Sequence, residues 1–171
     1  RYWLDPERVM FAQGNREERA RMGAVVRESR RCERIADLCA GIGYFTVPMA
    51  RSGGDVHAIE LNPVAFRYLE RNVAENGVQD RVQCSCGDCR DLLEGCYDRL
   101  VLGHFGSRAF LPAALQHARG GSVLHVHSIG SMEAEIRALS AAHGFSAEVS
   151  VRRVKKYGPR ALHVVQDVRL T

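Results

Sequence analysis

The sequence lacks a long hydrophobic run. Its 171 residues contain no uninterrupted apolar stretch of about 18 residues, the length that a membrane-spanning helix requires. No basic segment followed by an apolar one stands near its start, so we predict neither a signal peptide nor a membrane partner. Internal repeats, low-complexity stretches and interdomain linkers are missing as well. We therefore expect one cytoplasmic domain over residues 1–171, in which residues 1–30 form an initial segment and a helix.

A strong charge imbalance is also missing. The 24 Lys and Arg against 20 Asp and Glu give a net charge of +4, which permits a polyanionic partner without requiring one. The six cysteines do not follow a zinc pattern, because Cys84 and Cys86 of the closest group fall on a predicted strand instead of on paired loops. We predict no metal site, and reduced thiols as in cytosolic proteins.

Short apolar segments alternate with helical patterns along the chain. We predict parallel strands at residues 34–39, 55–60, 81–86, 99–102 and 121–127, and an antiparallel pair at 146–154 and 162–169 joined by Tyr157, Gly158 and Pro159. We predict helices at residues 17–30, 44–51, 63–76, 109–118 and 132–143. The predicted fold class is α/β, a doubly wound, mostly parallel Rossmann-like sheet closed by an antiparallel hairpin.

The segment "ADLCAGIGYFTVP" joins the first predicted strand to its helix through Gly41 and Gly43. Two glycines let the backbone approach a ligand closely, and the helix start behind them presents N–H groups. Glu60 ends the next predicted strand, where a carboxylate can accept both hydroxyls of an adenosine ribose. A dinucleotide fold usually has a third glycine, but Thr46 stands at its position. The pattern therefore favours S-adenosylmethionine, which has no pyrophosphate, over NAD.

An acidic residue, Asp88, follows the third predicted strand in "CGDCRD". At this place a carboxylate can accept a hydrogen bond from the adenine amino group. The alternative is an aspartate that only faces solvent in a loop. The residues alone leave both interpretations open.

Several segments together resemble one branch of the class I S-adenosylmethionine-dependent tRNA-modifying enzymes. They are "DLCAGIGYFTVPMA", "AIELNPVAFRYLERNVAENGV", "GDCRD", "VLHVHSIG" and "RRVKKYGPRALHVVQDVRL", and they follow one another through nearly the whole chain. The branch contains the tRNA guanine-N1 methyltransferase of position 37 and the aminocarboxypropyl transferase of wybutosine synthesis.

The resemblance implies a methyltransferase-type fold, S-adenosylmethionine as the cofactor and tRNA as the partner. It implies that the cofactor is bound by Cys39, Ala40, Gly41, Gly43, Glu60, Leu61, Asp88 and Cys89. The family's upstream RNA-recognition segment is expected to have no counterpart in this sequence. The sequence does not indicate an oligomeric state.

The stretch "DRLVLGH" bears on which of the two activities is present. The methyltransferases of the branch carry Asn-Leu-Pro or a similar motif here, whereas the transferases have glycine followed by tyrosine. This sequence has Gly103 and His104, and "LHVH" and Gly14-Asn15 favour the transferase in the same way. The resemblance therefore implies transfer of a 3-amino-3-carboxypropyl group to a guanosine-derived base at tRNA position 37. The alternatives are the N1-methyltransferase and a non-catalytic domain that binds S-adenosylmethionine or RNA.

The resemblance also implies roles for residues near the reacting groups. Gly103 is expected to leave room for a reoriented methionine chain, and His104 to contact that chain or the base. Glu18 matches a general base of the methyltransferase branch, although a helix ion pair is the alternative. Arg19 and Arg21 are candidates to bind the methionine carboxylate or an RNA phosphate, and otherwise belong to the charged face of their helix.

A basic run, "RRVKK", covers residues 152–156 near the end of the chain. Lysine and arginine in such a run either meet the RNA backbone or lie on a solvated face of the sheet. Both interpretations stay open.

Overall fold

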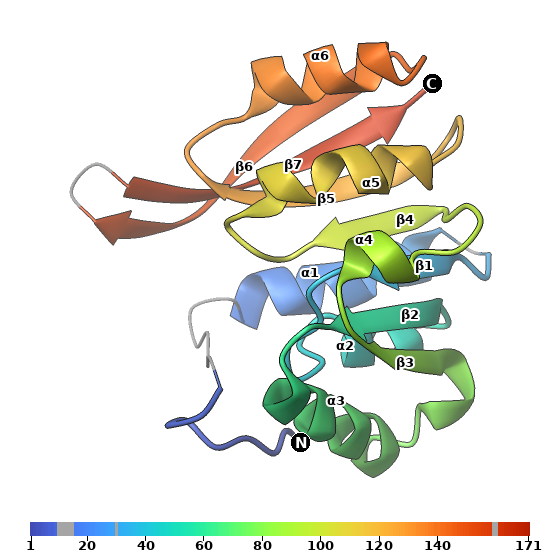
Figure 1. The fold of residues 1–171 in the computed structure, drawn as a ribbon, viewed down its shortest axis with the longest axis vertical. Helices are drawn as coiled ribbons and strands as arrows, with labels where there is room; N and C mark the ends of the chain where they lie inside the picture. Colours follow the sequence, from blue (N-terminus) through green and yellow to red (C-terminus); the bar gives the residue numbers. More distant parts are fainter. Residues whose placement is uncertain (10–15, 30, 159–160) are drawn as a thin grey trace. The chain divides into compact units, whose positions relative to one another are not determined.

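The computed structural model describes residues 1–9, 16–29, 31–158 and 161–171 (Figure 1). The predicted features at Gly14, Asn15 and Pro159 lie outside these residues. The chain divides into two compact units, Arg1–Leu92 and Leu93–Thr171. Among the described helices, none is both long and apolar enough to cross a bilayer.

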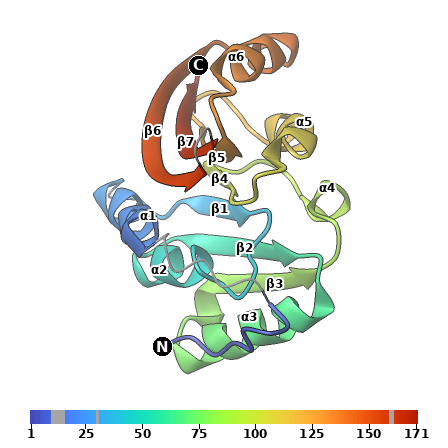
Figure 2. The same ribbon diagram turned by 90° about the vertical axis from the view of Figure 1, so that its left-hand side faces the viewer.

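The first unit alternates strands and helices. In chain order its elements are α1 (Arg16–Glu28), β1 (Arg34–Asp37), α2 (Thr46–Arg51), β2 (Asp55–Glu60), α3 (Pro63–Glu75), the 3-10 turn η2 (Gln79–Arg81), β3 (Val82–Cys86) and α4 (Cys89–Leu92). The strands lie in the order β3-β2-β1 and are parallel, with Arg34 opposite Asp55 and Val56 opposite Val82 (Figure 2). The predicted parallel arrangement of this half is confirmed.

Helix α3 begins where the sequence predicts. The Asn62 side chain accepts a hydrogen bond of 2.9 Å from the Val64 N–H, and Pro63 occupies the first turn, where no N–H is needed. Leu69 and Val73 are buried on the inner face of the helix.

A buried amide on α3 fastens two other segments to this helix. The Asn72 side chain donates to the Trp3 carbonyl at 3.0 Å and to the Ile42 carbonyl at 2.9 Å, and it accepts from the Trp3 N–H at 2.6 Å. The N-terminal segment consequently lies along α3 (Figure 2). Asn72 thus holds both this segment and the loop that follows β1.

The second unit begins with two parallel strands and ends with a long hairpin. Its elements are β4 (Arg99–Leu102), the 3-10 turn η3 (Ser107–Ala109), α5 (Leu111–Gln116), β5 (Val123–Ile129), α6 (Glu133–Ala142), β6 (Ala147–Gly158) and β7 (Ala161–Leu170). The strand order is β4-β5-β7-β6, with β4 and β5 parallel and β7 antiparallel to both β5 and β6. Figure 2 shows α5 and α6 on one side of these strands, and Figure 1 shows the hairpin projecting past β5. The predicted closing hairpin is confirmed.

Several element boundaries differ from the prediction; the largest extension is that of the strand predicted at residues 146–154, which continues to Gly158. The first strand ends at Asp37 instead of residue 39, because the chain has already entered a turn there. The fifth strand is shifted to Val123–Ile129, since Ser128 and Ile129 continue the pairing with β7. The short helix α4 was not predicted, because four residues are too few to show a helical period.

The histidines of β5 are buried inside the second unit. His125 lies 2.5 Å from the Asp167 carboxylate and 2.6 Å from the Arg99 guanidinium. His127 shares a hydrogen bond of 3.1 Å with His163 of β7. Both histidines are therefore buried core groups, and His125 has a hydrogen-bond partner at each ring nitrogen, whereas among the residues that the structure describes only the Nδ1 atom of His127 has one.

We predict that Asn72→Ala lowers the free energy of unfolding by about 2 kcal/mol or more. The substitution removes three hydrogen bonds and leaves buried backbone groups of Trp3 and Ile42 without their side-chain partner. Urea denaturation followed by circular dichroism measures the change. Asn76→Ala is the control on the same helix, since Asn76 is less buried and should cost less. An equal effect of the two substitutions would contradict this role of Asn72.

Candidate cofactor-binding site

A tight bend connects β1 to α2 in the first unit. Gly41 and Gly43 have φ angles of 58° and 91°, in the left-handed region that disfavours other residues. A Cβ on Gly43 would lie 3.1 Å from the Leu69 side chain, whereas one on Gly41 would meet nothing within 4 Å. The bend at Gly41 therefore borders open space into which a ligand can approach the backbone.

The Glu60 carboxylate joins this bend to the end of the neighbouring strand. One oxygen accepts from the Gly41 N–H at 2.7 Å, and the other accepts from the Asn62 N–H at 2.7 Å. A carboxylate has about four lone-pair sites, so two backbone bonds leave acceptor capacity on each oxygen. The structure thus brings together two predicted cofactor residues, Gly41 and Glu60, and leaves this carboxylate able to accept from vicinal hydroxyls.

The neighbours of these residues differ in exposure. Ala40 is buried, and its N–H donates to the Ile59 carbonyl at 2.9 Å, which fixes the start of the bend. Leu61, directly after Glu60, is 68% exposed. Its side chain offers an apolar surface next to the Glu60 carboxylate.

A buried aspartate stands at the end of β1. Asp37 accepts a hydrogen bond of 2.7 Å from the Thr46 hydroxyl, while its other oxygen has no hydrogen-bond partner among the described residues. Burial raises the pKa of Asp37 to about 7; the Thr46 hydrogen bond opposes this shift, and the nearby Glu60 adds to it. The carboxyl consequently titrates near neutral pH.

Two predicted cofactor residues from different strand ends meet as a pair of thiols. Cys39 follows β1 and Cys89 begins α4, and their side chains are hydrogen bonded. The hydrogen bond with Cys89, together with burial, raises the pKa of the Cys39 thiol well above its usual value. Cys39 is therefore a protonated, weakly polar group beside the bend, and both cysteines are free of disulfides.

Asp88 is held by the helix that it precedes. One oxygen accepts from the Arg90 backbone N–H at 2.9 Å, and the Arg90 guanidinium binds both oxygens at distances of 2.5 to 3.2 Å. Hydrogen bonding by Arg90 lowers the pKa of Asp88 to about 2. Asp88 is thus ionised, and its orientation is fixed by a neighbour that sequence reasoning did not connect to it.

Arg19 lies against two tyrosine rings near the bend. Its guanidinium carbon is 5.2 Å from the centre of the Tyr2 ring and 5.8 Å from that of Tyr44, which directly follows Gly43. Burial raises the pKa of Tyr2 to about 12, so this ring stays neutral. Sequence reasoning missed Tyr2 and Asn72; the only signal was a polar Asn on the apolar face of α3.

Glu18 on α1 is almost completely buried, with 3% of its surface exposed. The Arg21 side chain, one turn later, donates to both of its oxygens at 2.9 and 3.0 Å from Nε. The ion pair that we gave as the alternative is therefore present. Its role as a general base stays a prediction.

Gly103 and His104 belong to the second unit, directly after β4. The His104 Nδ1 atom accepts from the Gly106 N–H at 2.9 Å, and the exposed ring lies edge-on to Phe110 with 6.3 Å between the ring centres. Because Nδ1 is an acceptor, the neutral ring carries its proton on Nε2. His104 therefore presents an N–H donor beyond the carboxyl end of β4.

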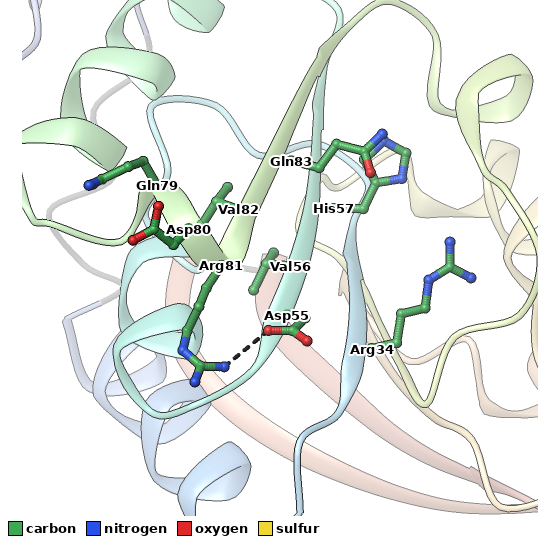
Figure 3. A pocket seen from close by; sticks show the side chains of 9 residues that line it. All are labelled: Arg34, Asp55, Val56, His57, Gln79, Asp80, Arg81, Val82 and Gln83. Atoms are coloured by element: carbon green, nitrogen blue, oxygen red, sulfur yellow. Dashed lines mark hydrogen bonds and ion pairs between the residues drawn. The ribbon is translucent and has the colours of Figure 1, made fainter.

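A polar hollow opens at the opposite, amino ends of β1, β2 and β3. Figure 3 shows the side chains that line it, which are Arg34, Asp55, Val56, His57, Gln79, Asp80, Arg81, Val82 and Gln83. Arg81 and Asp55 form an ion pair of 3.0 Å at its edge. Ligands of doubly wound folds bind at the carboxyl ends of the strands, so this hollow is separate from the candidate site. Within the described ranges, no three His, Cys, Asp or Glu side chains are placed to hold a metal ion.

We predict that Asp37→Asn removes a pH dependence of stability. The folded state keeps the Asp37 proton up to about pH 7, whereas the unfolded chain loses it near pH 4. This contribution is therefore complete below about pH 4 and is lost as the pH rises to 7. The advantage of Asp37→Asn over the wild type should grow over this interval, by about 4 kcal/mol at most.

Urea denaturation between pH 4 and 8 measures this difference. Asp55→Asn is the control, because Asp55 is exposed. A constant difference between wild type and Asp37→Asn would show that Asp37 is ionised throughout.

Known proteins resemble the chain over nearly its whole length. The TRM5/TYW2 methyltransferase domain matches residues 1–155. The tRNA(Phe) (4-demethylwyosine(37)-C(7)) aminocarboxypropyltransferase of Pyrococcus horikoshii is 33% identical over 99% of this chain. The chain spans 64% of the length of that relative.

Two solved structures from Methanocaldococcus jannaschii share the fold. TYW2 in complex with AdoMet matches with a TM-score of 0.88 and 31% identity, over 99% of this chain and 81% of that one. The tRNA m1G37 methyltransferase of the same organism matches with a TM-score of 0.87 and 25% identity, over 99% of this chain and 51% of that one. These similarities confirm the predicted Rossmann-like methyltransferase fold, and the chain belongs to the TRM5/TYW2 methyltransferase domain family.

Proposed function

We propose that this chain is the catalytic domain of an S-adenosylmethionine-dependent tRNA-modifying enzyme. The reaction is transfer of a 3-amino-3-carboxypropyl group to a guanosine-derived base at position 37, in wybutosine-type biosynthesis. The observation that carries the proposal is Gly103-His104 at the end of β4, in a chain that is 33% identical to a named aminocarboxypropyltransferase. The proposal places the enzyme in the cytoplasm, with tRNA as its partner.

The residues of the first unit fit S-adenosylmethionine. A Cβ on Gly41 would project into open space, and the Glu60 carboxylate beside it keeps acceptor capacity for the two ribose hydroxyls. Leu61 supplies an apolar surface for the adenine, and Asp88 supplies a fixed carboxylate for its amino group. The remaining residues assigned to the wall of the cofactor site are Cys39, Ala40, Gly43 and Cys89.

The amino-acid end of the cofactor requires a cation. Arg19 lies on the rings of Tyr2 and Tyr44, next to the bend, and its guanidinium can bind a carboxylate through two parallel hydrogen bonds. We assign Arg19 to the methionine carboxylate.

The choice of group transferred depends on the residues after β4. Bound S-adenosylmethionine supplies an electrophilic γ-carbon next to the sulfonium. Transfer of the aminocarboxypropyl group to the base releases methylthioadenosine and one proton from the base. Gly103 leaves space for the methionine chain to turn toward the base. His104 donates from Nε2, so it orients an acceptor on the chain or the base instead of removing a proton.

Glu18 is the proton acceptor that the family resemblance suggests. Its hydrogen bonds from Arg21 orient the carboxylate on α1. Proton transfer to Glu18 requires the base to share the carboxylate with Arg21.

Product analysis tests the proposed function. The protein is incubated with S-adenosylmethionine and tRNA(Phe) that carries 4-demethylwyosine, and nucleosides and small products are measured by mass spectrometry. An aminocarboxypropyl gain together with methylthioadenosine is the expected result. A methyl gain with S-adenosylhomocysteine would identify an N1-methyltransferase instead. Cofactor binding without turnover would identify a non-catalytic domain.

We expect Gly103→Asn to lower the rate of aminocarboxypropyl transfer by roughly tenfold or more. An added side chain would fill the space that we assign to the methionine chain, and overpacking typically costs about 1–3 kcal/mol. The rate is measured by methylthioadenosine release. Gly120→Asn is the control, because a Cβ there would meet nothing within 4 Å. Unchanged transfer by Gly103→Asn would rule out this role of Gly103.

We expect His104→Ala to lower kcat by about 10- to 100-fold, the usual cost of one lost hydrogen bond to a charged group. His104→Gln keeps an N–H donor and should restore most of the rate. If His104 acts only as a hydrogen-bond donor, the wild-type reaction does not require His104 to lose a proton. Equal kcat values for the Ala and Gln variants would refute the donor role.

A further inference from the structure

The second unit exposes two large apolar side chains at the carboxyl ends of its parallel strands. Phe105, three residues after β4, is 37% exposed, and Ile129, the last residue of β5, is 41% exposed. Neighbouring parallel strands end at the same edge of a sheet, and β4 pairs with β5. These two residues therefore lie on the edge where substrates of such folds bind.

A buried histidine connects the two. The Phe105 ring packs edge-on against His163, with 4.9 Å between the ring centres, and His163 is the β7 residue directly opposite Ile129. His163 is fully buried and shares a hydrogen bond of 3.1 Å with His127, which is also fully buried. The exposed ring of Phe105 consequently rests on a support that cannot easily move.

Hydrogen bonds fix the loop that carries Phe105. The hydroxyl of the buried Ser107 donates to the His127 carbonyl at 2.7 Å, and the Ser107 N–H donates to the His104 carbonyl at 3.0 Å. Phe105 lies between His104 and Ser107, which these hydrogen bonds hold in place. An aromatic side chain held in this way loses little conformational entropy when a flat ligand stacks on it.

Two basic residues of β6 lie opposite residues of β7 on the same face of the sheet. Lys155 of β6 lies opposite His163, and Arg152 lies opposite Val165, which in turn is opposite His127. Residues that lie directly opposite each other share a face of the sheet. Arg152 and Lys155 are an odd number of residues apart, but the irregularity between Arg153 and Lys155 places both on the face of Ile129 and His163.

Arg152 is exposed, and it has no ion pair to any residue that the structure describes. It is separated from β5 by two strand spacings, roughly 10 Å. A cation at this distance from an apolar platform matches a ligand that combines a flat base with a phosphate.

We propose that this face, made of Phe105, Ile129, Arg152 and Lys155, binds the RNA substrate. A nucleobase of the anticodon loop stacks on Phe105, and Arg152 contacts the phosphodiester backbone. The inference rests on the proposed function for the identity of the RNA, and it names the surface that receives it. Stacking on aromatic side chains together with cationic contacts is the usual way in which unpaired RNA is bound.

Basic residues on β6 have another explanation. This strand is at the edge of the sheet, and charged residues on edge strands prevent pairing with other chains. That explanation applies equally to both faces of the strand, whereas RNA binding needs only the face of Phe105. Arg153, the neighbour of Arg152, lies opposite Val164 on the other face. Comparing substitutions of Arg152 and Arg153 therefore distinguishes RNA binding from protection of the sheet edge.

The experiment measures the dissociation constant of tRNA(Phe) at several salt concentrations by filter binding, without turnover. Phe105→Ala should weaken binding by about 5- to 100-fold, as expected for one lost base stack, whereas Phe105→Trp should stay within about threefold of wild type. Val151→Ala, which removes an equally exposed apolar side chain from β6, should have no effect. Arg152→Ala should reduce the slope of log K against log salt by about 0.7 to 0.9, and Arg153→Ala should leave it unchanged.

Two results would overturn the inference. One is tRNA binding by Phe105→Ala at wild-type strength, and the other is an equal loss for Arg152→Ala and Arg153→Ala. S-adenosylmethionine binding, measured by calorimetry on every variant, confirms that each one is folded. A wild-type protein that binds tRNA through this face but transfers nothing would refute the proposed function and leave the surface standing.

Discussion

The hydrogen bonds accepted by the Glu60 carboxylate are the interaction on which the candidate site depends. They join the bend after β1 to the start of α3, so the ends of two neighbouring strands are tied through one side chain. Charge-assisted bonds to backbone N–H groups are stronger than neutral ones, and they orient the carboxylate before any ligand arrives. Gly41 is part of the same arrangement, since its left-handed φ aims its N–H at Glu60. Preorganisation of this kind lowers the entropy cost of binding.

The residues assigned in the proposed function come from both units. The first unit holds the groups that fit an adenosine and a carboxylate, which both activities of the family need. Gly103 and His104, which we propose to distinguish the two transfers, and Phe105, which we propose to stack on the RNA, all follow β4 in the second unit. The chain matches the TYW2 structure and the m1G37 methyltransferase structure with similar TM-scores of 0.88 and 0.87, so the fold alone does not separate the two activities.

The sequence predicted the elements whose physical signal is local. The alternation of strands and helices, the start of α3 at Pro63 and the position of Gly41 and Glu60 at neighbouring strand ends all follow from spacing and residue type. Contacts that depend on side-chain direction were not predictable: Cys39 with Cys89, Asp88 with Arg90, and Asn72 with two backbone segments. In each of these cases the residue type permits several partners, and only the tertiary structure selects one.

The link between Trp3, Asn72 and Ile42 has a practical consequence. The chain has a single tryptophan, and the Arg71 guanidinium lies 3.8 Å from the centre of its indole ring. Because the same amide binds the Trp3 backbone and the carbonyl between Gly41 and Gly43, a ligand that shifts the bend changes the surroundings of the indole. The protein thus carries an intrinsic fluorophore whose backbone shares the Asn72 amide with the glycine bend, and we expect its emission to respond to occupancy there without any label.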